Sequence, residues 1–210
     1  MNDIIDFFID AYRETPTYLI ILEAIAFVFG IMSVYYAKKA NILVYPTGII
    51  CTVITVYFLY VNEYFGDMMM NFYYSVMSIY GWWNWSRKKE NEYVVPISRT
   101  TRKEKLIGVL FFVLTMIVTY LVYKAYNYEL QIPNYIDIVT SGIFFTAMWY
   151  MANKKLENWT LWIIADIITI PLYAYRGLGM LSLQYLVFTI LAIQGYIEWK
   201  KSLNKKRVIA

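Results

Sequence analysis

The sequence predicts an all-α integral membrane protein with seven transmembrane helices. Of its residues 60% are hydrophobic and only 16% are charged, whereas a soluble domain carries about 25% charged residues. The apolar residues also form seven runs, each close to the ~20 residues that a helix needs to cross a bilayer. The expected spans are Tyr18–Ala37, Ile42–Val61, Met68–Trp85, Leu106–Tyr126, Tyr135–Ala152, Trp159–Tyr175 and Met180–Trp199.

Polar loops separate these runs, and most of them are short. Loops of this length force neighbouring helices to lie side by side as antiparallel hairpins. Trp and Tyr gather at the ends of the runs, for example Trp82, Trp83 and Trp85, as they do at the two interfaces of a membrane. Residues 1–17 are acidic where a signal peptide would be basic. We expect them to form an extracytoplasmic amphipathic N-terminus, with a frayed terminus as the alternative.

The distribution of basic residues predicts the orientation. Three of the 19 Lys and Arg residues, Arg13, Lys124 and Arg176, fall on one side of the predicted bundle. The other 16 fall on the opposite side, in the loops and in the C-terminal tail. Because basic loops stay in the cytoplasm, the N-terminus is expected outside and the C-terminus inside.

An internal repeat divides the chain. The segment that starts at Lys38, KKANILVYPTGII, is echoed by KKLENWTLWIIADII at Lys154, and YGWWNWSRKK at Tyr80 is echoed by QGYIEWKKS at Gln194. Two three-helix units joined by one inverting helix have the same orientation, which is the SWEET-like arrangement of sugar transporters. The expected parts are a first repeat (18–85), a basic cytoplasmic loop (86–105), a linker helix (106–126), a second repeat (135–199) and a basic cytoplasmic tail (200–210).

One ionisable residue, Asp166, stands in the middle of the sixth run. Trp159 and Trp162 precede it by seven and four residues, so the three side chains fall on one helix face. A carboxylate inside a membrane costs about 2.5–3.5 kcal/mol and is kept where it faces protein, a ligand or water. The two indoles offer flat surfaces for a cationic or aromatic ring. We therefore expect a binding site for a small heteroaromatic solute, with an interfacial role of Trp159 and a structural role of Asp166 as alternatives.

Polar residues on the third run are expected on the opposite wall of that site. Asn71, Ser75, Ser78 and Trp82 fall on one helix face, although such residues also bond neighbouring helices. Further expected features are Gln184 and Gln194 as weaker site residues, Glu23 and Asp137 near an entrance, and interruptions of the second and sixth helices at Pro46 and Pro171.

The composition excludes several kinds of site. The chain has no histidine and one cysteine, Cys51, so it has no intramolecular disulfide, no zinc site of the usual His or Cys type and no Ser-His-Asp chemistry. We expect no catalytic residues, no metal and no cofactor. Nucleic acid is not an expected partner, because the basic residues lie in loops between apolar runs.

The residues resemble the PnuC family of bacterial vitamin transporters, whose best-known members take up nicotinamide riboside. The resemblance extends from about Leu22 to Lys200 and is strongest in MMMNFYYSVMSIYGWWNWSR and ENWTLWIIADIITIPLYAYRG. The family pattern W-x-x-W-x-x-x-N is matched by Trp159 and Trp162, with Asp166 in place of the Asn. Asn71 stands where Gln is frequent.

This resemblance implies a homotrimer in the bacterial cytoplasmic (inner) membrane that takes up nicotinamide riboside by facilitated diffusion. A cytoplasmic vitamin kinase would trap the vitamin by phosphorylation. Thiamine is the alternative solute, because its aminopyrimidine N–H groups favour a carboxylate over an amide. Coupling to protons through Asp166 stays open. Two other classes are a non-transporting scaffold and, more distantly, an intramembrane aspartyl protease that uses Asp137 and Asp166.

Overall fold

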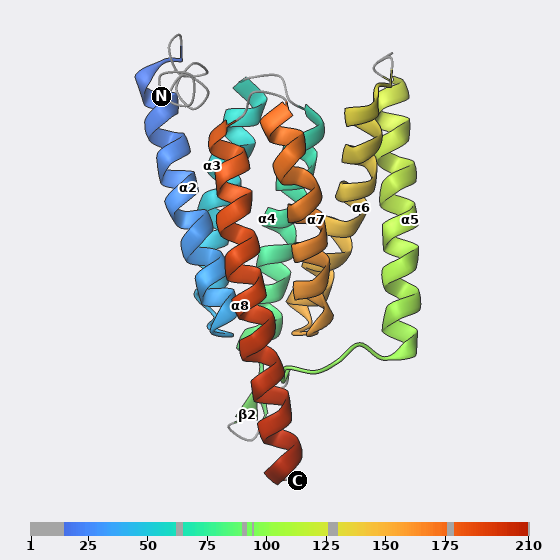
Figure 1. Cartoon of the computed structure of the whole chain (residues 1–210). Coiled ribbons are helices and arrows are strands. Elements are labelled where there is room, and N and C mark those ends of the chain that lie inside the picture. Colours follow the sequence, from blue (N-terminus) through green and yellow to red (C-terminus); the bar gives the residue numbers. More distant parts are fainter. Residues whose placement is uncertain are drawn as a thin grey trace.

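The computed structural model describes residues 15–61, 65–89, 92–93, 95–125, 130–175 and 179–209; the side chains of 65–67, 89, 92–93 and 206–209 are outside this description. Within these ranges seven long helices account for most of the chain (Figure 1). They are α2 (Thr17–Lys38), α3 (Val44–Val61), α4 (Phe65–Ser86), α5 (Arg102–Ala125), α6 (Ile132–Ala152), α7 (Glu157–Tyr175) and α8 (Gly179–Ile209).

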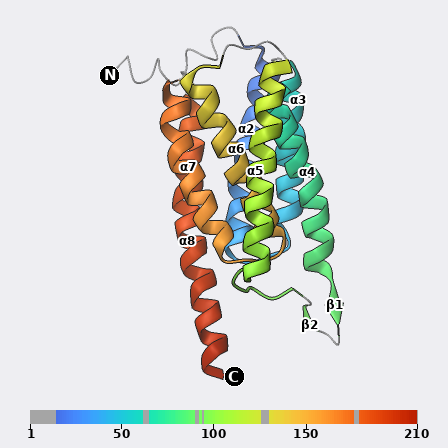
Figure 2. The same ribbon diagram turned by 90° about the vertical axis from the view of Figure 1, so that its right-hand side faces the viewer.

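The predicted all-α fold is confirmed, and each predicted span lies in one helix. Helix ends agree with the expected ends to within four residues, except at the end of α8. That helix runs on to Ile209 and carries the basic tail away from the bundle (Figures 1 and 2). Hydropathy alone would not extend it there, because the last turns of α8 are polar and gain little from burial.

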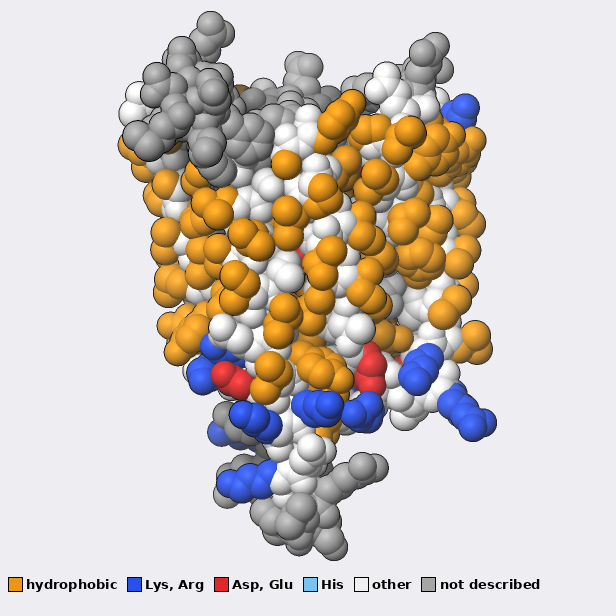
Figure 3. Space-filling model, viewed as in Figure 1, with side chains coloured by type: hydrophobic (Ala, Val, Ile, Leu, Met, Phe, Trp, Pro, Cys, Tyr) orange, Lys and Arg blue, Asp and Glu red, His pale blue; other side chains and the backbone are white. Residues whose placement is uncertain are grey.

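Four of the described helices, α2, α3, α5 and α8, are long and apolar enough to cross a membrane. The other three, α4, α6 and α7, have no stretch of 18 residues that is apolar enough by the same measure. Helices α6 and α7 hold a large share of the buried side chains. A polar residue on a buried helix face meets protein and not lipid, so it lowers the hydropathy of a helix without exposing that residue to the membrane. The visible middle of the molecule is covered mainly by hydrophobic side chains (Figure 3).

Six helices form a closed ring. Its order, by principal neighbours, is α2, α3, α4, α6, α7, α8 and back to α2, while α5 packs on α6 at the edge of the bundle. We call α2–α4 the first triplet and α6–α8 the second triplet. The triplets meet at two seams, α2–α8 and α4–α6, and each seam joins the first helix of one triplet to the third helix of the other.

Basic side chains gather at one end of the bundle, at the bottom of Figure 3. We call it the basic end; it carries the α2–α3 turn, the α4–α5 loop, the α6–α7 turn and the extension of α8. The loop contains a two-residue hairpin of β1 (Lys88–Lys89) and β2 (Glu92–Tyr93), a small exception to the all-helical fold. Farther along, Ser98 bonds through its backbone to Lys154 (3.0 Å) and Leu156 (2.8 Å), so the loop lies against the α6–α7 turn.

The same local structures recur 114 residues apart in the two triplets. The indole of Trp85 donates to the Ala152 carbonyl at 3.1 Å, and that of Trp199 donates to the Lys38 carbonyl at 3.2 Å. Both tight turns contain one residue with a left-handed backbone, Ala40 and Lys154, each with φ of 49°. The predicted match of Tyr80 with Gln194 has this same register, whereas the predicted match of the two Lys-Lys pairs, 116 residues apart, differs from it by two residues.

Close helix contacts follow the same register. A Cβ at Gly195 would lie 2.7 Å from the ring of Trp159, and a Cβ at Gly81 would likewise overlap the ring of Tyr45. Both aromatic residues belong to a buried group that we call the basic-end core. Its members are Ala37, Val44, Tyr45, Trp85, Leu156, Trp159, Ala192 and Trp199.

One expectation about helix breaks is wrong. Pro46 is the third residue of α3 and does not interrupt it, because the first turn of a helix has no partner for its N–H groups and tolerates proline. Pro171 lies inside α7, and the helix continues through it from Glu157 to Tyr175, so the expected interruption is not seen there either. The expectations for residues 1–14, the Asn62–Asp67 loop and Arg176 concern positions outside the described part of the chain, in whole or in their side chains.

Candidate functional site

Asp166 is buried in the middle of α7. Its side chain is 1% exposed, and its Oδ1 has no hydrogen-bond partner among the described residues. A buried carboxylate without a partner costs several kcal/mol unless a ligand, water or positive charge compensates it. The position therefore has the properties of a binding group, and its side chain faces the protein and not lipid.

Rings from several helices gather beside Asp166. On α7, Trp162 precedes it by one turn and Tyr173 follows it by two, so all three side chains lie on one face. The centroid of the Trp162 ring is 5.4 Å from that of Phe144 on α6, and the Tyr173 ring is 5.3 Å from that of Tyr185 on α8. Because Phe144 and Tyr185 are themselves 6.0 Å apart, the rings form a continuous group around the level of Asp166.

Both triplets contribute to this group, which we call the aromatic cluster. Tyr74 of α4 adds a ring 6.2 Å from Trp162, and Phe188 of α8 adds one 5.9 Å from Tyr185. The cluster consists of Tyr74, Phe144, Trp162, Tyr173, Tyr185 and Phe188. Flat rings beside one carboxylate suit a cationic heteroaromatic ring, which gains from stacking and from the negative charge.

Trp159 occupies a different place from Trp162. It is buried in the basic-end core, where its ring lies edge-on to Trp199 at 5.5 Å and covers Gly195. Its Nε1 has no hydrogen-bond partner among the described residues. The described ring contacts of Trp162 are with Tyr74 and Phe144. The two indoles, both expected beside Asp166, therefore have different neighbours, and Trp159 lies nearer to the basic end than the aromatic cluster does.

The polar residues of α4 have partners inside the first triplet. Ser75 Oγ lies 2.7 Å from Thr52 Oγ1 of α3 and also donates to the Asn71 carbonyl at 3.0 Å. Ser78 is buried where α4 passes Gly48 of α3. Ser75 and Ser78 thus join α4 to α3, while the Asn71 side chain is half-buried one turn earlier. The described contacts do not bring these residues together with Asp166.

The other predicted site residues lie in three places. Trp82 is 43% exposed on the outside of α4 near the basic end. Gln194 accepts a hydrogen bond from Lys38 Nζ at 2.8 Å, so it belongs to the α2–α8 seam. Gln184 is half-buried, and its amide nitrogen would lie 3.1 Å from a Cβ at Gly30 of α2, close to Phe188 of the aromatic cluster.

Sequence reasoning missed the tyrosines and phenylalanines of the aromatic cluster. The chain has 22 Tyr and 12 Phe, too many for composition to distinguish these few. The repeat held a usable signal, because Tyr74 and Phe188 stand 114 residues apart and both lie in the cluster.

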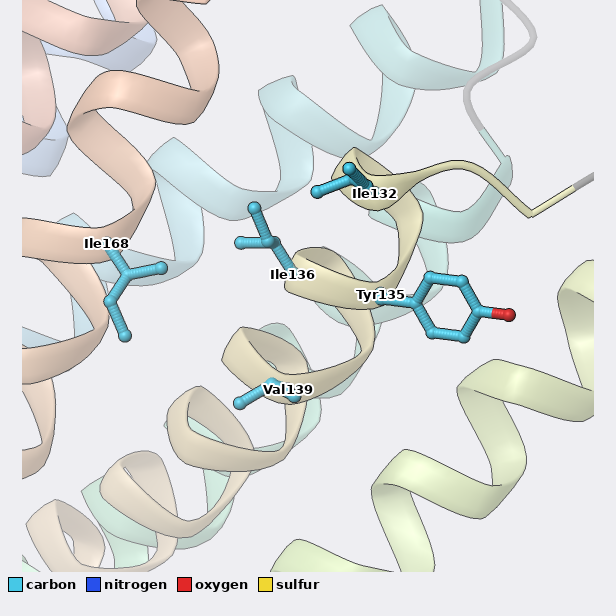
Figure 4. Close-up of a pocket in the computed structure, with 5 residues that line it drawn as sticks. All are labelled: Ile132, Tyr135, Ile136, Val139 and Ile168. Atoms are coloured by element: carbon cyan, nitrogen blue, oxygen red, sulfur yellow. The ribbon is translucent and has the colours of Figure 1, made fainter.

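An apolar hollow of about 310 Å³ lies elsewhere, between α6 and α7. Ile132, Ile136, Val139 and Ile168 line it with Tyr135, whose ring points away from Ile168 in Figure 4. It includes neither Asp166 nor a residue of the aromatic cluster. Without polar groups it has nothing to orient a vitamin.

The described part of the chain does not pair Asp166 with a second acid. Asp137 Oδ2 accepts a hydrogen bond from Tyr123 of α5 at 3.1 Å. Since α6 lies between α5 and α7, Asp137 is directed away from the helix that carries Asp166. Within the described residues no group of three or more His, Cys, Asp or Glu could hold a metal ion.

Three comparisons place these features among known proteins. The profile of a family described as "Nicotinamide mononucleotide transporter" matches residues 20–201. The nicotinamide riboside transporter PnuC of Escherichia coli (strain K12) is 22% identical over 208 residues, which cover 88% of this chain and 87% of that protein. The riboflavin/roseoflavin transporter RibM of Streptomyces davaonensis is 23% identical over 128 residues, which cover 59% of this chain and 58% of that protein.

A solved structure has the same architecture. The crystal structure of the vitamin B3 transporter PnuC superimposes on this chain with a TM-score of 0.70 and 27% sequence identity. The match covers 88% of this chain and 82% of the other. The similarity therefore includes nearly all of the bundle, both triplets and α5.

Proposed function

Because the chain belongs to the nicotinamide mononucleotide transporter family, as its resemblance to PnuC predicted, we propose that it carries nicotinamide riboside across the bacterial inner membrane. Its similar proteins are transporters and not enzymes, and the chain is a multi-pass membrane transporter of this family. Nicotinamide riboside is proposed as the solute because the PnuC relatives are named for it and because it suits the chemistry around Asp166.

The single observation that carries the proposal is the buried, unpartnered carboxylate beside the aromatic cluster. The solute has a cationic pyridinium ring, an amide and a ribose. Trp162 stacks on the ring, with about 0.5–2 kcal/mol from cation–π attraction. Asp166 balances the charge or accepts from ribose hydroxyls. The amide of Gln184, which lies close to Phe188 of the aromatic cluster, and that of Asn71 on α4 are proposed to bind the solute amide or ribose.

Transport is proposed to proceed by facilitated diffusion in a homotrimer. The sequence has no Walker A motif, so the chain has no evident means to use ATP. A cytoplasmic kinase that phosphorylates the vitamin keeps the internal concentration of free solute low, and this drives net uptake.

The proposed architecture is the SWEET-like one, two parallel triplets with a site between them. It is supported by the hydrogen bonds that recur 114 residues apart and by the position of α5 outside the ring. In this arrangement the basic end faces the cytoplasm, in accordance with the excess of Lys and Arg there.

Thiamine is the second candidate solute. The observation that favours it is Asp166 at a position where the resemblance places Asn, because a carboxylate accepts from the aminopyrimidine of thiamine and balances its thiazolium charge. The similarity to RibM, a riboflavin and roseoflavin transporter, indicates that relatives of this fold carry other vitamins.

Uptake into proteoliposomes tests the proposal. Purified protein is reconstituted with a nicotinamide riboside kinase and ATP inside, and labelled nicotinamide riboside is added outside. We expect accumulation that requires the kinase, together with equilibration to equal concentrations when ATP is left out. Accumulation of thiamine alone, with thiamine kinase inside, would select the second candidate, and uptake of neither vitamin would contradict both.

A further inference from the structure

We propose that the α2–α8 seam is the cytoplasmic gate of this transporter and that the α4–α6 seam is the pivot on which it opens. The inference deepens the proposed function and rests on it. The basic-end core lies between the aromatic cluster and the basic end, since Trp159 precedes Trp162 and Asp166 along α7. A solute that leaves the cluster toward the cytoplasm must therefore pass where the two triplets meet.

The α2–α8 seam is held by the buried hydrogen bonds of Trp199, by the Lys38 ammonium and by an exposed ion pair. Lys38 Nζ donates to Gln194 at 2.8 Å and lies 3.7 Å from Glu198 Oε1. Trp199 of α8 donates to the carbonyls of Ala37 and Lys38 at the end of α2, at 3.1 and 3.2 Å. Beside it, Lys39 Nζ lies 3.2 Å from Glu198 Oε1, with the two side chains 48% and 35% exposed. Exposed ion pairs contribute little, because water and salt screen them.

The α4–α6 seam has the corresponding contacts in a different chemical form. Trp85 of α4 donates to the Ala152 carbonyl at the end of α6, as Trp199 does at α2. The residues that correspond to Glu198 and Lys39 in the 114-residue register are Asn84 and Asn153. Asn84 is only 2% exposed, and its Nδ2 donates to the Ala152 carbonyl at 2.9 Å. This seam is therefore closed by buried, neutral hydrogen bonds, which water does not screen.

The α4–α5 loop adds a second restraint on the same side. Its Ser98 forms the two backbone hydrogen bonds with the α6–α7 turn that are described above, and the Glu104 carboxylate pairs with Lys155 Nζ at 2.7 Å. The Lys154 ammonium lies 4.4 Å from the centroid of a Trp85 ring. The start of α5, the α6–α7 turn and the end of α4 are thereby joined into one unit.

The two seams thus share one geometry and differ in strength. Separation of α2 from α8 breaks the Trp199 hydrogen bonds and exposed ion pairs, whose charges gain hydration when they part. Separation of α4 from α6 likewise frees an indole N–H, and it also leaves the buried amide of Asn84 without its partner, which adds to the cost. The seam that opens at lower cost is α2–α8, and this difference assigns gate and pivot.

Paired cross-links test the assignment. In a Cys51→Ser background, Lys39→Cys/Glu198→Cys and the corresponding pair Asn84→Cys/Asn153→Cys are joined with a short, reducible thiol cross-linker. We expect the first cross-link to lower uptake of nicotinamide riboside at least tenfold, with recovery after reduction and equilibrium binding within threefold of the uncross-linked protein. The second cross-link is expected to leave uptake within twofold. Ser86→Cys/Asn153→Cys, which also joins the end of α4 to the end of α6, serves as a second pivot-side pair if the Asn84 variant does not fold.

The assignment is overturned if the first cross-link leaves uptake unchanged, or if cross-links on both sides stop it equally. A solute-independent measurement separates this failure from failure of the proposed function. Spin labels at Lys39 and Glu198 are expected to show two distance populations in a bilayer, whereas labels at Ser86 and Asn153 show one. If the reduced variants take up no vitamin while the labels behave as expected, the proposed solute is contradicted and the assignment of the gate is supported. One distance population at both seams contradicts the assignment of the gate.

Discussion

At the scale of single residues, the site depends on a carboxylate that the protein leaves without a partner. Asp166 has an unbonded buried oxygen, while most other buried polar side chains in the bundle have hydrogen bonds to a carbonyl, such as Thr169 to Ala165 at 2.8 Å. Residues kept in such an unfavourable state belong to sites of function more often than to structural cores. The side chain of Asp166 is 1% exposed and therefore faces protein and not lipid, and the partner that we propose for it is the solute.

Trp162 is predicted to contribute to affinity through its ring. Trp162→Ala should weaken vitamin binding by about 0.5–2 kcal/mol, or roughly 3- to 30-fold, because the stacking and cation–π surface is lost. Trp162→Phe should recover part of the affinity. Titration calorimetry on the purified variants measures the change.

Trp82→Ala is the matched control for this prediction. The sequence placed Trp82 in the site, but the structure exposes 43% of it on the outside of α4. Its removal should leave the dissociation constant within twofold. Equal losses in the Trp82 and Trp162 variants would contradict the distinction between the aromatic cluster and the surface.

The sequence was informative about residues whose chemistry is rare in a membrane. Asp166 stood out as a lone charge in an apolar run, and its burial agrees with the expectation that it faces protein. Ser75 and Ser78 share a helix face as predicted, but they bond or approach α3, because a hydroxyl in a bilayer takes the nearest acceptor. Sequence periodicity shows which residues share a helix face, but it does not show which neighbouring helix that face contacts.

At the scale of elements, two glycines set the distance between helices. Gly195 of α8 lies under the ring of Trp159, and Gly81 of α4 lies under Tyr45. Each contact ties the third helix of a triplet to the second at the basic end. The pattern is one of small residues that let a helix approach a large ring, as at other helix interfaces in membranes.

Gly195→Ala is predicted to destabilise the protein by about 1–3 kcal/mol, because its Cβ would lie 2.7 Å from the Trp159 ring in a core that has little room to adjust. Gly48→Ala is the control, because its Cβ would lie 3.0 Å from one side-chain atom, Ser33 Oγ, which is a milder approach than 2.7 Å to a ring. Thermal unfolding in detergent should show a clearly lower midpoint for Gly195→Ala than for Gly48→Ala. Similar midpoints would contradict close packing at this contact.

Helix positions were largely predictable, since an apolar run of about 20 residues has few alternatives in a membrane. The helical extension of α8 was not, because its polar residues carry no hydropathy signal. One of the two sequence echoes had the structural register: Tyr80 and Gln194 are 114 residues apart, and Gly81 and Trp85 are matched by Gly195 and Trp199. The other echo, Lys38 with Lys154, was two residues out of register because it aligned basic pairs and not the backbone turns.

At the scale of the whole molecule, the charge distribution gives an orientation that can be measured. The basic end carries Lys38, Lys39, Lys154 and Lys155 together with the extension of α8 (Figure 3). Basic loops remain on the cytoplasmic side during insertion. The proposed gate and the proposed trapping by a cytoplasmic kinase both depend on this orientation.

A single cysteine at Ser202 of α8 is predicted to lie in the cytoplasm. In the Cys51→Ser background, Ser202→Cys should react with a membrane-impermeant maleimide in inside-out vesicles, where the cytoplasmic face of the membrane is outside. It should stay unreacted in intact cells, where the reagent reaches only the extracytoplasmic face. A Tyr18→Cys variant, at the other end of the bundle, is the control with the opposite pattern. Labelling of Ser202→Cys in intact cells would reverse the orientation.

Asp166 is predicted to set the selectivity of the whole transporter between the two candidate vitamins. Asp166 stands where the resemblance places Asn, and replacement by Asn removes the charge while it preserves the shape. The change should act on solute choice more than on folding, since the Oδ1 atom has no described partner to lose.

Equilibrium titration of nicotinamide riboside and thiamine against the native protein and Asp166→Asn tests the proposed site most directly. We predict that the ratio of the two dissociation constants changes at least tenfold, about 1.4 kcal/mol, with thiamine weakened more and the melting temperature nearly unchanged. Equal loss of affinity for both vitamins, or no loss for either, would contradict Asp166 as the group that receives and selects the solute.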